Sequence, residues 1–160
     1  MSLQISKKFG FVNCIVPLDI NGAATAGDEV NTKLYDHVTF VLSVGNIGAN
    51  ATLIVEECTS AAGAGNTARA FNYRKSGASG GATADTYSAL TAATAAGITL
   101  AAASDDNKVV IIEVDAAELT SGSPFVRVYL TPGAAATLVS CIGICSGPRN
   151  ETEIMPSAIS

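Results

Sequence analysis

The sequence has few aromatic residues and little charge. It contains no Trp, aromatic residues make up 6% of its 160 residues, and Asp, Glu, Lys and Arg together make up 14%. An ordinary soluble domain carries roughly 25% charged residues. This shortage indicates that partners cover part of the surface, because a domain surrounded by water needs more charge to stay soluble.

Positive charge is scarce and scattered along the chain. Nine Lys and Arg stand against fourteen Asp and Glu, which gives a formal net charge of −5. Nucleic-acid binding needs clustered cations that neutralise phosphates, so we exclude nucleic acid as a partner. No segment reaches the roughly 18 uninterrupted apolar residues of a membrane-spanning helix, and we expect no contact with a membrane.

The usual catalytic and metal-binding motifs are also missing. His37 is the only histidine, and neither a Gly-x-Ser-x-Gly elbow, a P-loop nor a dinucleotide fingerprint occurs despite 15 glycines. We predict that the chain is not an enzyme, has no small-molecule substrate, and holds no catalytic residue, cofactor or metal ion. His37 is interpreted as a strand-end residue without a catalytic role.

The acidic residues leave an enzymatic alternative open. Glu56, Glu57, Glu113 and Asp115 lie near the ends of predicted strands, and two carboxylates that face one cleft can hydrolyse glycosides. A polysaccharide-cleaving enzyme that uses Glu57 or Glu113 is therefore kept as a hypothesis. The acidic segment Asp105–Asn107 lacks the ligand pattern of an EF-hand loop and is predicted to be a turn.

The four cysteines, Cys14, Cys58, Cys141 and Cys145, form no C-x-x-C pair. Cys141 and Cys145 lie on one face of a predicted strand, about 13 Å apart, which is too far for a disulfide. We predict that all four are small buried hydrophobes in a protein made in a reducing cytosol. The alternative is that Cys14 or Cys58 lies at the surface and cross-links subunits in an oxidising environment.

Short apolar runs rich in β-branched residues recur along the chain. There are eight: Phe11–Leu18, His37–Val44, Ala51–Glu57, Ala68–Arg74, Ile98–Ala102, Val109–Val114, Phe125–Leu130 and Thr137–Cys145. Turn sequences such as Asn21-Gly22 and Pro132-Gly133 separate them. This rhythm predicts an all-β fold, a single antiparallel β-sandwich or jelly-roll-like barrel of about eight strands.

One domain, residues 1–160, accounts for the whole chain, with a core at 9–145 and extended arms at 1–8 and 146–160. Asp115–Leu119 is predicted to form a helical turn capped by Asp115, with Leu119 folded back onto the sheet. The segment Ser76–Gly97 is rich in small residues and is predicted to be a long loop or an irregular β excursion. We expect Tyr87 and Leu90 to anchor it, or a neighbouring subunit to order it.

Several segments resemble small virion proteins of tailed phages. The resemblance begins with Val16–Gly22, which contains Pro-Leu-Asp-Ile-Asn-Gly, and continues through Leu34–Val38 and Val109–Leu119. It ends with Gly147–Arg149 and Met155–Ile159. These are structural motifs, and none is a catalytic signature.

The resemblance implies a β-rich accessory head protein of the decoration or cement type. Such a protein binds the outside of an assembled capsid, so the expected partners are the major capsid protein and copies of itself, with a homotrimer as the expected state. The expected location is the capsid surface of the virion, after synthesis in the cytoplasm of the host bacterium. The alternative is a tail- or fibre-associated protein that binds a receptor or glycan, although Tyr35, Tyr73 and Tyr129 are expected to be packing residues.

Overall fold

The protein is all-β in a computed structural model, which describes residues 5–149. These residues form twelve strands and two 3-10 turns. The strands are β1 (Gly10–Asp19), β2 (Thr25–Ala26), β3 (Val30–Asn31), β4 (Tyr35–Ile47), β5 (Ala51–Cys58), β6 (Thr67–Arg69), β7 (Phe71–Lys75), β8 (Thr91–Ala93), β9 (Ile98–Leu100), β10 (Val109–Asp115), β11 (Phe125–Thr131) and β12 (Thr137–Pro148). The turns are η1 (Ile5–Lys7) and η2 (Ala116–Glu118).

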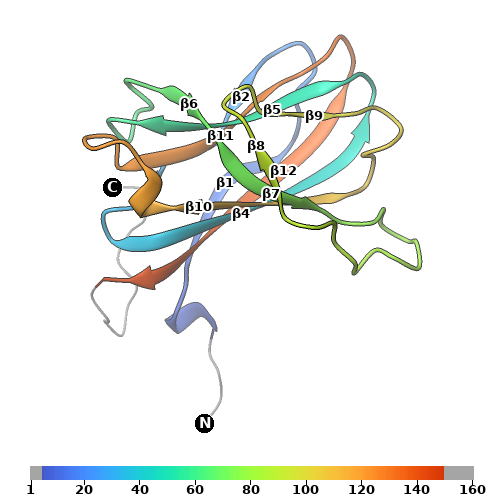
Figure 1. Ribbon diagram of the computed structural model, residues 1–160. Helices are drawn as coiled ribbons and strands as arrows, with labels where there is room; N and C mark the ends of the chain where they lie inside the picture. The colour runs from blue at the N-terminus through green and yellow to red at the C-terminus, as the bar shows by residue number, and fades with distance from the viewer. Residues whose placement is uncertain (1–4, 150–160) are drawn as a thin grey trace.

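The strands form two antiparallel sheets in a sandwich-like arrangement (Figure 1). The first sheet, called sheet A, has the order β1-β12-β4-β10-β7-β8. The second, called sheet B, has the order β2-β11-β5-β6, with β3 paired to β11 and β9 paired to β5. The fold class is therefore all-β as predicted, with more strands than the predicted eight.

Alternation along the strands builds the core between the sheets. In β4 every second side chain from Val38 to Val44 is buried, and β10 faces it in register, so that Phe40 pairs with Ile112. Sheet B supplies Leu53 and Val128 to the same apolar cluster. Because successive side chains of a strand point to opposite faces, the residues between the buried ones lie on the outer face of sheet A.

All eight predicted runs contain strands, although the run Ala68–Arg74 is not one element. It is divided at Ala70 into β6, which belongs to sheet B, and β7, which belongs to sheet A. The run was predicted as one strand because its apolar character continues through the point where the chain crosses between the sheets. The two- and three-residue strands β2, β3 and β8 were not predicted, because elements of that length have too few residues to show a period.

The predicted boundaries of the arms are partly wrong. Ser146–Pro148 belongs to β12, where Ser146 pairs with His37, and is not part of an arm. Residues 5–7 form η1. The remainder of both predicted arms, residues 1–4 and 150–160, lies outside the described residues.

The predicted helical turn is present, but its predicted cap is wrong. Asp115 precedes η2 without a side-chain hydrogen bond to the turn, because its carboxylate binds His37 instead. Leu119 packs against the core as expected. Within residues 5–149 no helix is long and apolar enough to cross a membrane.

The segment Ser76–Gly97 is an irregular β excursion, one of its two predicted forms. Ser76 and Tyr87 form an isolated bridge, and β8 then pairs with β7 at the edge of sheet A. The prediction that Tyr87 and Leu90 anchor this segment is wrong, because their exposed fractions are 44% and 49%.

Candidate functional site

Glu56 on β5 belongs to a buried ion-pair network in sheet B. It accepts hydrogen bonds from Arg127 on β11, at 2.8 Å, and from Asn66, at 2.9 Å. Arg127 also donates to Glu29, at 2.6 Å. Desolvation of the guanidinium lowers the pKa of Arg127, but the hydrogen bonds that it donates to Glu56 and Glu29 outweigh this effect and raise the pKa. These contacts join four segments of the chain: β5, β11, the loop before β6 and the segment before β3.

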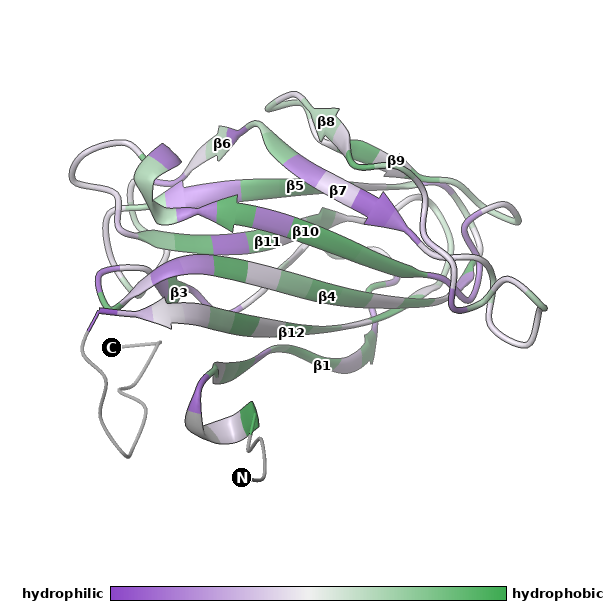
Figure 2. Ribbon diagram, turned by 60° about the horizontal axis from the view of Figure 1, so that its bottom comes forward, coloured by the Kyte–Doolittle hydropathy of each residue, from purple (hydrophilic) through white to green (hydrophobic). Residues whose placement is uncertain are grey.

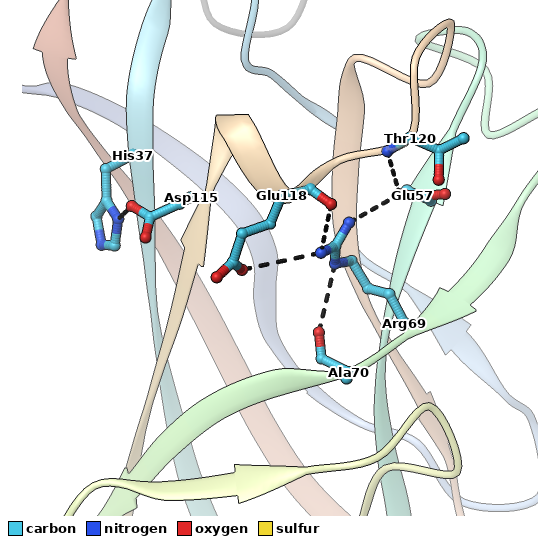
Figure 3. Close-up of polar contacts among 7 residues, drawn as sticks. All are labelled: His37, Glu57, Arg69, Ala70, Asp115, Glu118 and Thr120. Carbon is cyan, nitrogen blue, oxygen red and sulfur yellow. Dashed lines mark hydrogen bonds and ion pairs between the residues drawn. The ribbon is translucent and has the colours of Figure 1, made fainter.

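Glu57, the next residue, binds a different arginine (Figure 3). Its carboxylate accepts from Arg69, at 2.8 Å, and from the backbone N–H of Thr120, at 3.0 Å. Burial favours a higher pKa for Glu57, but the hydrogen bonds from Thr120 and the positive charge of Arg69 outweigh it and lower the pKa. The general acid of a glycosidase needs a raised pKa, so these contacts suit a structural ion pair.

Arg69 connects that pair to η2. Its guanidinium donates to the carbonyl of Glu118 at 2.8 Å and lies 3.8 Å from the Glu118 carboxylate (Figure 3). Because Arg69 comes from β6 and Glu57 from β5, the arginine fixes the turn against sheet B. Glu57 and Glu118 both have Arg69 as their cationic partner, and the network stabilises the packing of η2 against sheet B.

The other two carboxylates hold His37 between them on the outer face of sheet A. The Nε2 of His37 lies 2.6 Å from Glu113, and its Nδ1 lies 2.6 Å from Asp115. Glu113 also accepts from the hydroxyl of Thr39, at 2.9 Å. Both ring nitrogens therefore face carboxylate oxygens, an arrangement that the doubly protonated imidazolium satisfies.

The protonation of His37 follows from these contacts. Desolvation lowers the pKa of its imidazole, but the hydrogen bonds to Asp115 and Glu113 outweigh that effect and raise it. Glu113 and Asp115 were singled out from the sequence, but their contact with His37 was not predicted. The spacing of two residues between Glu113 and Asp115 could have indicated that both side chains lie on one face of a strand. In the structure this face of β10 lies beside the first residues of β4.

All four cysteines are buried and free, as predicted. The alternative with Cys14 or Cys58 at the surface is wrong, because their exposed fractions are 5% and 0%. The sequence did not predict that the Sγ of Cys14 lies over Gly143, where a Cβ atom would be 3.0 Å away. The hydrogen bond with Cys14 and burial raise the pKa of Cys141, and burial raises the pKa of Cys145 to about 12. Buried protonated thiols are poor nucleophiles.

The acidic segment at 105–107 is a turn, as predicted. Asp105 accepts from the ammonium of Lys75 at 2.6 Å and from the backbone N–H of Ala101 at 2.9 Å. Asp106 accepts from the backbone N–H of Ile47. Its carboxylates therefore hold the turn in place. Among residues 5–149, no group of three or more His, Cys, Asp and Glu residues could hold a metal ion.

The outer face of sheet A carries exposed apolar side chains. Phe11 on β1 and Leu138 and Ile142 on β12 have exposed fractions of 52%, 49% and 47%. Ile142, Val41 and Ile111 occupy one cross-strand row over β12, β4 and β10. We call the outward apolar side chains of these four strands, Phe11, Val41, Ile111, Leu138 and Ile142, the outer apolar face. Figure 2 shows the apolar residues along these strands.

The sequence contained a signal for this face that was not used. In β12 the buried residues Val139 and Cys141 alternate with the outward residues Leu138, Ser140 and Ile142, so apolar side chains lie on both faces of the strand. A strand with one solvated face alternates apolar and polar residues. The outward Leu138 and Ile142 therefore depart from the pattern of a strand with one solvated face.

Comparison with known proteins identifies no relative. No family model, no curated protein and no solved structure matches the chain. Function is therefore argued from the residues and the fold alone.

Proposed function

We propose that this protein is a non-catalytic virion structural protein that decorates and stabilises the outside of a phage capsid. The observation that carries the structural part of the proposal is the outer apolar face, with Phe11, Leu138 and Ile142 about half exposed. Burying such side chains against a partner is favourable by about 25 cal/mol per Å². The proposed partners are the major capsid protein and copies of this chain, assembled as a homotrimer.

The size of the face supports an association role. The outer side of the four adjacent strands spans roughly 600 Å² at the usual strand spacing and rise, and this area includes the polar cluster of His37, Glu113 and Asp115 beside the apolar side chains. A standard stable interface buries about 800 Å² on each partner, so this face and its rim approach that area. Contiguous apolar patches of a few hundred Å² on soluble proteins commonly mark interaction sites.

The strand order supports a jelly-roll-like topology. If β3, β7, β8 and β9 are set aside, sheet A reads β1-β12-β4-β10 and sheet B reads β2-β11-β5-β6. Eight strands arranged in this way form two interleaved Greek keys, the architecture of many viral capsid and lectin domains. This likeness is one of fold and favours a virion role only by analogy.

The assignment to a phage capsid depends on the sequence resemblance described above. Val16–Gly22 covers the end of β1 and its turn, and Val109–Leu119 covers β10 and η2. Met155–Ile159 lies outside the described residues. In this proposal the protein is made in the host bacterial cytoplasm and is located on the capsid surface of the virion.

Cosedimentation with capsids that lack the protein tests the proposal. We expect saturable binding of the wild type and at least about tenfold weaker binding of a Phe11→Thr/Ile142→Thr variant. Leu90→Thr is the matched control, because Leu90 is as exposed as these residues but lies in the 76–97 excursion. Wild-type protein that does not saturate the shells would overturn the capsid role.

A tail- or fibre-associated protein with receptor- or glycan-binding function is the second candidate. The exposed side chains of Tyr87 and Leu90 in the 76–97 excursion favour it, because aromatic and apolar loop residues are common binding anchors. Tyr35 and Tyr73 are packing residues, as expected. Binding to host cells that Tyr87→Ser abolishes, with no binding to capsids, would favour this candidate over decoration.

A further inference from the structure

A hollow of about 190 Å³ lies at the end of the sandwich where the turn after η2 meets the segment before β4. It is separate from the outer apolar face. Two cationic side chains line it, Lys33 and Arg149, together with hydroxyl side chains from Thr32 and the turn at 120–124. None of its lining residues within the described chain is Asp or Glu, although the whole chain carries a net charge of −5.

Neither cation is strongly paired with a carboxylate of the described chain. Lys33 takes part in no ion pair among residues 5–149; only its backbone N–H is engaged, with Asn31. Arg149 donates from Nε to Asp36, at 3.0 Å, across a pair whose side chains are 52% and 67% exposed. Exposed pairs of this kind are worth little. Within residues 5–149 the other guanidinium N–H groups of Arg149 have no side-chain partner and can bind a ligand.

Ser123 adds a hydroxyl group at the wall of the hollow. The residue is 9% exposed, and its backbone N–H donates to Thr120 at 2.9 Å. Its hydroxyl makes no hydrogen bond with another residue of the described chain. The oxygen of this hydroxyl is not fully enclosed, so it is accessible to a polar ligand that enters the hollow and can donate a hydrogen bond to it.

The turn that carries Ser123 is fixed before any ligand arrives. Thr120 donates its backbone N–H to Glu57, at 3.0 Å, and Arg69 in turn holds Glu57. On the other side, Thr32 donates both its backbone N–H and its hydroxyl to the carbonyl of Pro124, each at 2.8 Å. A preorganised wall lowers the entropic cost of binding.

We propose that this hollow binds a small oxyanion group, with Lys33 and Arg149 neutralising its charge and Ser123 donating a hydrogen bond. A guanidinium, an ammonium and a hydroxyl together match the oxygens of phosphate, sulfate or carboxylate. The group can be a free anion or the acidic substituent of a sugar. This site is independent of the proposed capsid role and goes beyond it.

Titration of the full-length protein with inorganic phosphate, and separately with glucuronate, tests the site at constant ionic strength. Amide chemical shifts are followed by NMR. We expect saturable shifts at Gly122, Ser123 and Lys33, with at least about tenfold weaker binding in Lys33→Gln/Arg149→Gln. Saturation by phosphate alone assigns a tetrahedral anion, and saturation by glucuronate alone assigns a sugar carboxylate.

Arg74→Gln is the matched control. Arg74 is an exposed cation on β7 that does not line the hollow, so its replacement makes the same change in net charge as Lys33→Gln without removing a proposed contact. We expect binding within about twofold of wild type. Shifts that do not saturate with either anion, or equal weakening by Arg74→Gln and Lys33→Gln, would overturn the proposal. Lys33→Gln alone, at an exposed position, keeps the test valid if the double variant does not fold.

Discussion

Both faces of sheet A carry apolar side chains, but only the inner face is covered. On the inner face Phe40, Leu42 and Ile112 have no exposed surface. On the outer face Phe11 and Ile142 expose about half of their surface. The same strands therefore present two packing surfaces, one facing sheet B and the other facing solvent.

This difference separates residues that stabilise the fold from residues available for association. A side chain on the inner face contributes its transfer free energy as soon as the chain folds. A side chain on the outer face contributes fully only when a partner covers it. Substitutions on the two faces should therefore differ in whether they change the stability of the protein or its assembly.

Phe40→Ala and Phe11→Ala compare the two faces with the same chemical change and give the largest expected difference. Removing the buried ring of Phe40 leaves a cavity and should cost about 3 to 5 kcal/mol in the free energy of unfolding. Removing the half-exposed ring of Phe11 should cost less than about 1 kcal/mol. Urea denaturation of both variants measures this, and similar losses would contradict the division between the faces.

Arg127→Met and Arg149→Gln extend the comparison to ion pairs. The side chain of Arg127 is 12% exposed and that of Glu56 is 7% exposed, so the substitution leaves a buried carboxylate without its cation and should cost about 3 kcal/mol. Arg149→Gln breaks an exposed pair and should cost less than about 0.5 kcal/mol. Thermal unfolding measures both; an Arg127→Met variant as stable as wild type would show that the buried pair is dispensable.

His37 gives a smaller, pH-dependent effect at the rim of the outer face. Its folded pKa is raised above the usual value by Asp115 and Glu113, so its stabilising contribution is complete below about pH 6.5 and is lost as pH rises through the folded pKa. The loss follows because a neutral imidazole can donate to only one of the two carboxylates. The stability difference between wild type and His37→Gln should therefore shrink from pH 6 to higher pH.

NMR titration of the imidazole gives the direct check. His37 is the only histidine in the chain, so its resonance needs no assignment. Its midpoint should lie above about 6.5 and should fall in Glu113→Gln/Asp115→Asn. Thr39→Val, which removes the neighbouring hydroxyl bond to Glu113, should move the midpoint less. A wild-type midpoint below 6.5 would contradict the assignment.

Thr137→Val is expected to have the smallest effect. The hydroxyl of Thr137 is buried without a hydrogen-bond partner among the described residues, whereas its backbone groups bind Asp19 and Ile20. Replacing the hydroxyl with a methyl group removes an unsatisfied polar group, so the free energy of unfolding should stay the same or rise by up to about 1 kcal/mol. A clear loss of stability would show that the hydroxyl has a bound partner.

The sequence predicted the longer strands because their signal is local. Val38 to Val44 and Val109 to Val114 are apolar runs rich in β-branched residues, and recognising such a run needs no knowledge of the partner strand. No local sequence pattern indicates that the chain passes from sheet B to sheet A at Ala70, between β6 and β7. Which sheet each half joins depends on long-range pairing with β5 and β10.

The side-chain clusters were less predictable for the same reason. The hydrogen bonds of His37 join residues 76 and 78 positions away, and no pattern in the sequence states that register. Glu113 and Asp115 were recognised as strand-end carboxylates, but their partner was not. The likeness of the termini to phage virion proteins remains a prediction, since it concerns short structural segments in a chain without a detectable relative.

Covalent footprinting of the assembled particle tests the outer apolar face most directly. Free protein and decorated capsids are labelled with a diffusible carbene reagent, and the modification of Phe11, Leu138 and Ile142 is compared with that of Tyr87 and Leu90. The account predicts strong protection of the first three residues on assembly and little change at the other two. Equal labelling of the outer apolar face in free and assembled protein would contradict its role in association.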